Sequence, residues 1–157
     1  GAVVLSIVKN APAGLGEPLY DKLDSALAAA LMGINGVKAV EIGAGVKASE
    51  TFGSVNNDEM DELGFLSNNA GGILGGISSG EDIVLKSHFK PTPSIFKEQK
   101  TLNLQGEVVD FELRGRHDPC IGIRGSVVAT AMIRLVIADM LLLNATTKLD
   151  NLKKIYG

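Results

Sequence analysis

The chain is poor in aromatic residues and in cysteine. It has no tryptophan, two tyrosines and five phenylalanines among 157 residues, so aromatic side chains fill little of its interior. Because 45% of its residues are hydrophobic, alanine and aliphatic side chains must build the core. One cysteine cannot form an internal disulfide, and we therefore expect a reducing, cytoplasmic compartment.

The chain also lacks an excess of basic charge and a long uncharged apolar run. Lysine and arginine total 15 against 18 acidic residues, and no basic stripe stands out, which argues against nucleic-acid binding. The longest apolar run, Ile133 to Leu143, is interrupted by Arg134 and Asp139 and is too short to span a bilayer. Since Gly1 leads directly into an apolar segment without a methionine, we expect a piece of a longer protein.

Glycine is abundant instead, with 19 residues that cluster at expected turns. Apolar periodicity predicts one α+β domain over residues 1–157, with a mainly antiparallel sheet packed against helices. The expected strands are Ala2–Val8, Val37–Ile42, a half-exposed Asp82–Phe89, and a hairpin of Thr101–Leu104 with Val108–Leu113. The expected helices are Leu19–Met32, about Ser126–Leu143, and a short amphipathic tail, Thr147–Tyr156. Residues 43–62 are expected to be irregular.

The turn from Gly115 to Cys120 is the strongest candidate site. It places Arg116, His117 and Asp118 beside the only cysteine, immediately before an apolar helix. An arginine offers a fork for phosphate or carboxylate, while histidine and aspartate can move protons. The alternative is a structural Arg–Asp pair that locks the turn. We expect no metal site, because no second cluster supplies further ligands, and Cys120 is expected to be a small buried side chain.

A second candidate is the loop from Lys90 to Ser94, where two prolines stiffen a segment bearing one ammonium and two hydroxyl groups. It suits an anionic ligand, or it is simply an edge crossing between strands. The pairs Gly71-Gly72 and Gly75-Gly76 match neither a dinucleotide fingerprint nor a phosphate loop, and we interpret them as strand crossings.

These segments together resemble the C-terminal part of chorismate synthase. The Gly-Arg-His-Asp-Pro-Cys turn with Ile121–Arg124 resembles that family most closely, and further matching segments follow in the family's order across essentially the whole chain. They are Gly14–Pro18, Glu41–Gly43, Gly53-Ser54 with Asn56–Asp58, Asn68–Gly80 and Lys90–Thr92. The resemblance implies a β-α-β sandwich and a homotetramer. It also implies that the family's N-terminal half, with its catalytic histidine, is absent here, so that the fragment alone lacks full activity.

The resemblance implies an enzyme that converts 5-enolpyruvylshikimate 3-phosphate to chorismate and phosphate with reduced FMN, in aromatic amino-acid biosynthesis. Asp118 is the implied catalytic residue, near flavin N5, with Arg116 expected to balance its charge. His117 receives no role, and the source of the flavin's reductant, such as NADPH through the enzyme's own reductase activity, stays open. The implied FMN-binding residues are Asn35, Gly36, Gly75, Lys90, Pro91, Thr92, Pro93, Ser94 and Arg116. The alternatives are a non-catalytic domain that binds a phosphate ligand or flavin, and an oligomerisation module.

Overall fold

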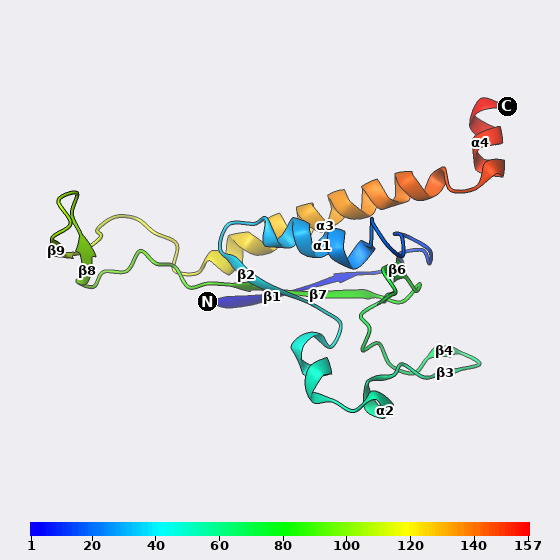
Figure 1. The fold of residues 1–157 in the computed structure, drawn as a ribbon, viewed down its shortest axis with the longest axis horizontal. Coiled ribbons are helices and arrows are strands. Elements are labelled where there is room, and N and C mark those ends of the chain that lie inside the picture. The colour runs from blue at the N-terminus through cyan, green and yellow to red at the C-terminus, as the bar shows by residue number, and fades with distance from the viewer.

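The computed structural model describes residues 1–157. It contains one three-stranded sheet, several helices and three short two-stranded hairpins (Figure 1). The strands are β1 (Ala2–Val8), β2 (Val37–Ile42), β3 (Met60–Asp61), β4 (Gly64–Phe65), β5 (Ile73–Leu74), β6 (Ile77–Ser78), β7 (Ile83–Phe89), β8 (Gln99–Leu102) and β9 (Val108–Phe111). The helices are α1 (Leu23–Met32), the 3-10 helix η1 (Gly45–Glu50), α2 (Gly53–Asn56), α3 (Ile121–Ala145) and α4 (Leu149–Tyr156).

The main sheet has three strands in the order β1-β7-β2, and β7 pairs antiparallel with both neighbours. Helices α1 and α3 lie side by side on one face of it (Figure 1). The expected α+β class with antiparallel pairing is confirmed. The opposite face of this sheet is open and carries Val3, Leu5 and Ile7, which are 49–58% exposed. Within these residues, therefore, helices cover one face of a single main sheet.

The core lies between this sheet and the two helices. Side chains alternate in and out along β7, so that Ile83, Leu85 and Phe89 face the helices, as period-2 patterning predicts. From α1, Leu23, Leu27 and Leu31 meet them with no exposed surface. Their spacing of four residues places all three on one helical face, whereas Leu19, four residues before Leu23, is exposed.

Helix α1 begins at Leu23, not at Leu19 as the sequence predicted. The backbone carbonyl of Gly76 accepts the amide hydrogen of Leu23 at 2.8 Å and so satisfies the first donor of the helix. Upstream, the Ser78 hydroxyl donates to the Pro12 carbonyl at 2.6 Å and accepts from the Leu15 amide at 2.9 Å. These tertiary bonds anchor the loop before α1, in which Leu19 is 70% exposed.

Helix α3 begins at Ile121, five residues before the predicted start. Gly122 and Gly125 have no side chain and let the helix approach the sheet closely. A Cβ at Gly122 would lie 2.5 Å from that of Ala2, and one at Gly125 would lie 2.6 Å from the Phe89 ring. The sequence predicts an apolar run too short to span a bilayer, but the 25-residue α3 has the length and the composition of a membrane-spanning helix. Its Ala129, Ile133 and Met140 pack into the core.

The sequence predicts irregular structure for residues 43–62, but they contain η1, α2 and the two-residue strand β3. The Asp58 carboxylate joins the end of this segment to residues 67–70. It accepts hydrogen bonds from the Ser67 hydroxyl at 2.6 Å, the Asn69 amide at 2.6 Å and the Ala70 amide at 2.8 Å. Gly43 and Gly71 approach so closely that a Cβ on either would overlap the other's backbone, and both have positive φ. The first glycine pair thus marks a crossing of two chain segments, as predicted.

The expected hairpin is present as β8 and β9, which pair from Gln99↔Phe111 to Leu102↔Val108. It projects well away from the sheet (Figure 1), and every residue of both strands is exposed. The two candidate segments connect this hairpin to the rest of the chain, with Lys90–Ser94 before it and Gly115–Cys120 after it. The predicted C-terminal helix is also present, as α4.

Substitution of Leu27 by alanine tests the core. We expect Leu27→Ala to lower the free energy of unfolding of the intact protein by about 2–5 kcal/mol, because it leaves a cavity at a fully buried position. The matched control is Leu19→Ala, at an exposed position, which should change it by less than about 0.5 kcal/mol. Urea denaturation measures both, and equal effects would contradict the assigned helix start.

Acidification tests the Asp58 cluster. Burial alone would raise the pKa of Asp58, but hydrogen bonds from Ser67, Ala70 and Asn69 outweigh it and hold the pKa below its usual value of 3.8. A carboxyl group whose pKa is lower in the folded protein than in the unfolded chain stabilises the folded state. This stabilisation is complete above the pKa of the unfolded chain and is lost as pH falls through the pKa of the folded protein. The protection of the Asn69 and Ala70 amides, measured as exchange relative to the intrinsic rate at the same pH, should therefore fall below about pH 4.

In Asp58→Asn the protection of these amides should already be low at pH 6 and should not fall further on acidification. Identical pH profiles for the variant and the wild type would show that the Asp58 carboxylate does not hold this loop.

Candidate functional site

The turn after β9 and the loop after β7 meet at the N-terminal end of α3. The Thr92 hydroxyl donates a hydrogen bond of 2.9 Å to the main-chain carbonyl of Asp118 and so joins the two segments. They line one cavity of about 480 Å³, formed by Thr92, Pro93, Ser94, Arg116, His117, Asp118, Ile121 and Arg124. Segments 26 residues apart in sequence thus form the two walls of one site.

Local sequence explains both walls. Strand β7 ends at Phe89, after which Pro91 and Pro93 remove backbone donors and direct the chain away from the sheet. On the other wall, Gly115 has a φ of +153° and lets the chain turn back toward Pro119. The His117 ring lies 6.4 Å from the Phe96 ring, and its Nε2 would be 3.2 Å from a Cβ at position 115. His117 therefore packs the turn against the loop.

Charges in the cavity are paired differently from our expectation. We expected Arg116 to balance Asp118, but Arg124, from the first turn of α3, pairs with the Asp118 carboxylate. Arg116 is exposed and forms no ion pair. The cavity thus contains one neutralised carboxylate and one unpaired guanidinium, an arrangement that suits an anionic ligand.

Other predicted residues lie at different distances from this cavity. Gly36 has a φ of +93°, and its carbonyl accepts the Lys90 amide at 2.8 Å, which places it behind the loop. Asn35 precedes it and is exposed, as are Lys90 and Pro91. Gly75 turns the β5–β6 hairpin beside the start of α1, whereas the cavity adjoins the C-terminal end of β7. The chain does not bring Gly75 to the cavity.

Two further features near the cavity were not predicted correctly: the burial of Cys120 and the ion pair of Arg124. Cys120 is half-buried rather than fully buried. Arg124 received no role, because helix α3 was predicted to begin after it. Once the helix begins at Ile121, Arg124 falls in its first turn, within reach of Asp118.

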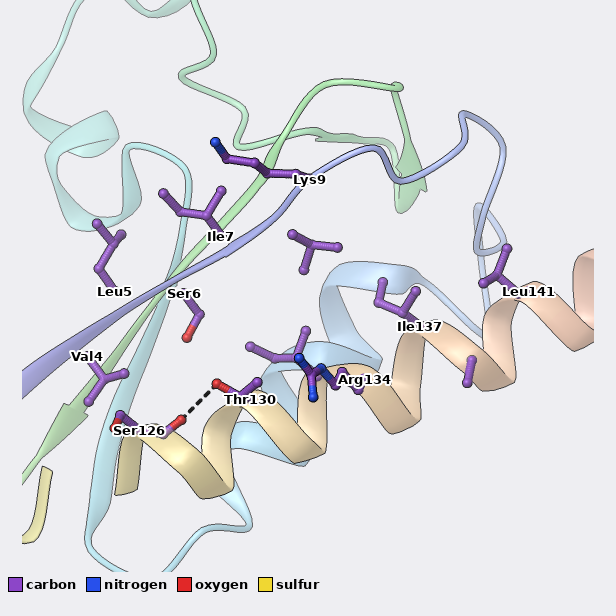
Figure 2. A pocket seen from close by; sticks show the side chains of 13 residues that line it. Val4, Leu5, Ser6, Ile7, Lys9, Ser126, Thr130, Arg134, Ile137 and Leu141 are labelled. Atoms are coloured by element: carbon purple, nitrogen blue, oxygen red, sulfur yellow. Dashed lines mark hydrogen bonds between the residues drawn. The ribbon is translucent and has the colours of Figure 1, made fainter. Parts of the chain in front are cut away.

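A larger groove of about 570 Å³ runs between β1 and α3 (Figure 2). Aliphatic side chains such as Val4, Ile137 and Leu141 line it, together with the charged Lys9 and Arg134. The Thr130 hydroxyl in its wall donates to the Ser126 carbonyl of the same helix at 2.9 Å, so it is already engaged. None of the predicted site residues lines this groove, whereas Thr92, Pro93, Ser94, Arg116 and Asp118 line the smaller cavity.

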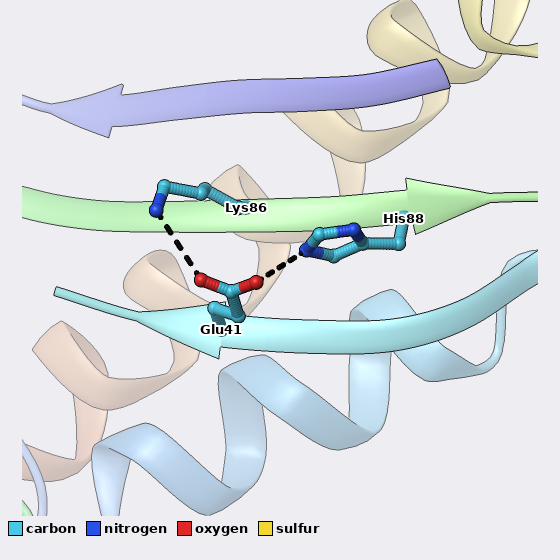
Figure 3. Close-up of polar contacts among 3 residues, drawn as sticks. All are labelled: Glu41, Lys86 and His88. Carbon is cyan, nitrogen blue, oxygen red and sulfur yellow. Dashed lines mark hydrogen bonds and ion pairs between the residues drawn. The ribbon is translucent and has the colours of Figure 1, made fainter. Parts of the chain in front are cut away.

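A polar cluster lies on the open face of the sheet (Figure 3). The Lys86 ammonium donates to Glu41 Oε2 at 3.2 Å, and His88 Nε2 lies 2.7 Å from Glu41 Oε1. The Lys86 hydrogen bond and the nearby His88 ring hold the pKa of Glu41 below its usual value, although burial acts in the opposite direction. Since Val3 pairs with His88 and Leu5 with Lys86, this cluster borders the exposed apolar stripe of β1.

Loss of the Thr92 hydroxyl tests the junction of the two walls. We expect Thr92→Val to accelerate amide exchange at His117, Asp118 and Cys120, since a hydrogen bond of this kind contributes about 0.5–1.5 kcal/mol. The matched control is Thr101→Val in the exposed strand β8, which should leave these amides unchanged. Unchanged exchange in Thr92→Val would show that the loop and the turn are held together by other contacts.

Known proteins are similar to this chain over most of its length. The family model described as chorismate synthase matches residues 1–142. A chorismate synthase of Campylobacter concisus (strain 13826) is 88% identical over 157 residues, covering all of this chain and 44% of the relative. One of Campylobacter jejuni subsp. jejuni (strain 81-176) is 62% identical and is covered over 43% of its length.

A solved structure, described as the crystal structure of chorismate synthase, superposes with a TM-score of 0.73 at 32% identity. The superposition covers 92% of this chain and 38% of that one. The chain thus spans less than half the length of the curated relatives and of the solved chain that it matches. With its family model, close relatives and fold in agreement, the chain belongs to the chorismate synthase family.

Proposed function

We propose that the protein containing this chain converts 5-enolpyruvylshikimate 3-phosphate to chorismate and phosphate by anti-1,4-elimination, with reduced FMN as cofactor. The observation that carries the proposal is the shared cavity, in which the Lys90–Ser94 loop and the Gly115–Cys120 turn meet through the Thr92–Asp118 hydrogen bond. Membership of the chorismate synthase family supports the same reaction.

The residues of the cavity fit a phosphorylated cofactor. Its volume of about 480 Å³ lies in the range of ligand pockets, about 300–1,000 Å³. Thr92 and Ser94 offer hydroxyl groups, and the unpaired Arg116 offers a fork of donors to an anion. Ile121 supplies an aliphatic surface beside them. Such a donor set matches the phosphate and the polar ring edge of a flavin better than it matches an uncharged ligand.

Each residue has a proposed role. Arg116 and Lys90 bind the negative charge of FMN, while the Pro91 and Pro93 rings hold Thr92 and Ser94 in place. Asn35 and Gly36, which lie behind the loop, would contribute further contacts to the cofactor. When bound, reduced FMN supplies electron density to the substrate as phosphate leaves. Asp118 holds or returns a proton at flavin N5. Gly75 stays a proposed backbone contact that these residues alone do not bring to the cavity.

The proposal concerns the whole protein. Because the chain covers 44% of the C. concisus relative, the remainder would supply further substrate contacts, and we propose that residues 1–157 alone lack full activity. We also propose that residues 1–157 form the C-terminal half of one domain. The whole protein is then a cytoplasmic homotetramer, and its flavin is reduced either by NADPH through the enzyme's own reductase activity or by an external source.

Phosphate release tests this function. The full-length protein, given reduced FMN and 5-enolpyruvylshikimate 3-phosphate without oxygen, should release phosphate and form chorismate. Arg116→Ala should weaken FMN binding by about 10-fold or more, since a charged hydrogen bond is lost. Asp118→Asn should retain FMN binding and slow turnover by at least about 100-fold, within the range of proton-transfer catalysis.

Absence of phosphate release from a folded, FMN-loaded protein would leave a non-catalytic binding domain as the better description. A melting temperature that FMN does not raise would favour the oligomerisation module, because a ligand that binds only the folded state must stabilise it.

A further inference from the structure

Asp118 is held from two sides. Its main-chain carbonyl accepts from the Thr92 hydroxyl at 2.9 Å, and its carboxylate Oδ2 accepts from the Arg124 guanidinium. We propose that Arg124 is a positioning residue that fixes the Asp118 carboxylate at the cavity wall and leaves Arg116 free for the anionic ligand. This inference rests on the proposed function, because it concerns the same site.

Stability does not account for the Arg124–Asp118 pair. The side chain of Arg124 is 80% exposed and that of Asp118 38%, and ion pairs this accessible to water contribute little to folding. Folding stability therefore gives no reason for this ion pair.

Helix stability does not account for Arg124 either. The N-terminus of a helix carries partial positive charge, which disfavours a cation in the first turn. Arg124 is the fourth residue of the 25-residue helix α3, and no acidic residue lies in that first turn. Only Asp118, outside the helix, compensates it. The arginine therefore stands where it disfavours the helix and favours the turn.

A charge-assisted hydrogen bond explains how orientation is imposed. One guanidinium nitrogen of Arg124 donates to Oδ2 of Asp118 and so restrains that oxygen of the carboxylate. With Thr92 fixing the backbone and Arg124 fixing the side chain, both ends of Asp118 are restrained. Arg116 and His117 are the other ionisable groups of the cavity, and neither forms an ion pair with Asp118.

Turnover of the full-length protein tests the role. We expect Arg124→Gln to lower kcat about 10- to 100-fold, as small misplacements of a catalytic group do. The KM for substrate and the Kd for FMN should change less than about 3-fold, in contrast to Arg116→Ala. Arg124→Lys should recover part of the lost kcat. Arg114→Gln is the matched control, since Arg114 is equally exposed and pairs with Glu112 outside the cavity, and it should leave kcat unchanged.

A double-mutant cycle separates positioning from direct contact. If Arg124 acts through Asp118, then Arg124→Gln added to Asp118→Asn should cause no further loss of kcat. A further loss as large as in the wild-type background would overturn the proposal, as would an unchanged kcat in Arg124→Gln. A fall in FMN affinity equal to that of Arg116→Ala would make Arg124 a ligand-binding residue and would also overturn it.

A crystal structure of FMN-free Arg124→Gln gives a readout that does not depend on activity. The Asp118 carboxylate should leave its place at the cavity wall or occupy more than one rotamer, while the turn backbone stays in place through Thr92. A carboxylate that stays in one unchanged rotamer would refute the positioning role. If the wild-type protein released no phosphate, the proposed function would fail, but this structure would still decide what Arg124 does to Asp118.

Discussion

The site depends on how closely the start of α3 approaches the end of β7. Gly122 lies against Ala2 and Gly125 against the Phe89 ring, at distances that leave no room for a Cβ without displacement of its neighbour. Because the helix begins directly against the sheet, the turn that precedes it is placed beside the loop that leaves β7. The Thr92 hydroxyl and the Asp118 carbonyl are then close enough to form their hydrogen bond of 2.9 Å. A helix set farther from the sheet would leave the two walls of the cavity apart.

Within that frame, the two arginines of the cavity have different electrostatic roles. Arg124 belongs to the helix and neutralises Asp118, whereas Arg116 belongs to the turn and is unpaired. A carboxylate beside an anionic ligand would repel it unless its charge were balanced. The pairing therefore lets the turn present a positive charge and a carboxylate in the same cavity.

The same fold leaves large apolar surfaces without a partner. The outer side chains of β1, the groove between β1 and α3, and the projecting hairpin all expose aliphatic or aromatic groups. β1 is also an edge strand with neither lysine nor proline within it, and such edges are normally protected. An isolated two-stranded hairpin is marginally stable in water. These surfaces agree with a chain that spans less than half of its relatives' length.

Strong local patterns are enough to predict several elements from the sequence. The apolar run predicts β1, alternation of apolar and polar residues predicts β2 and β7, the Gln-Gly turn predicts the β8–β9 hairpin, and apolar periodicity predicts most of α1. The family can be recognised in the same way, because each of its motifs is a continuous stretch of the chain. The starting points of α1 and α3 depend instead on tertiary contacts, since Gly76 sets the start of α1 and Gly122 packs against a strand 120 residues earlier. The tertiary structure likewise decided that Asp118 pairs with Arg124 rather than with Arg116. Local propensity reports a residue's neighbours in the chain, whereas charge pairing and helix ends depend on groups that folding brings together.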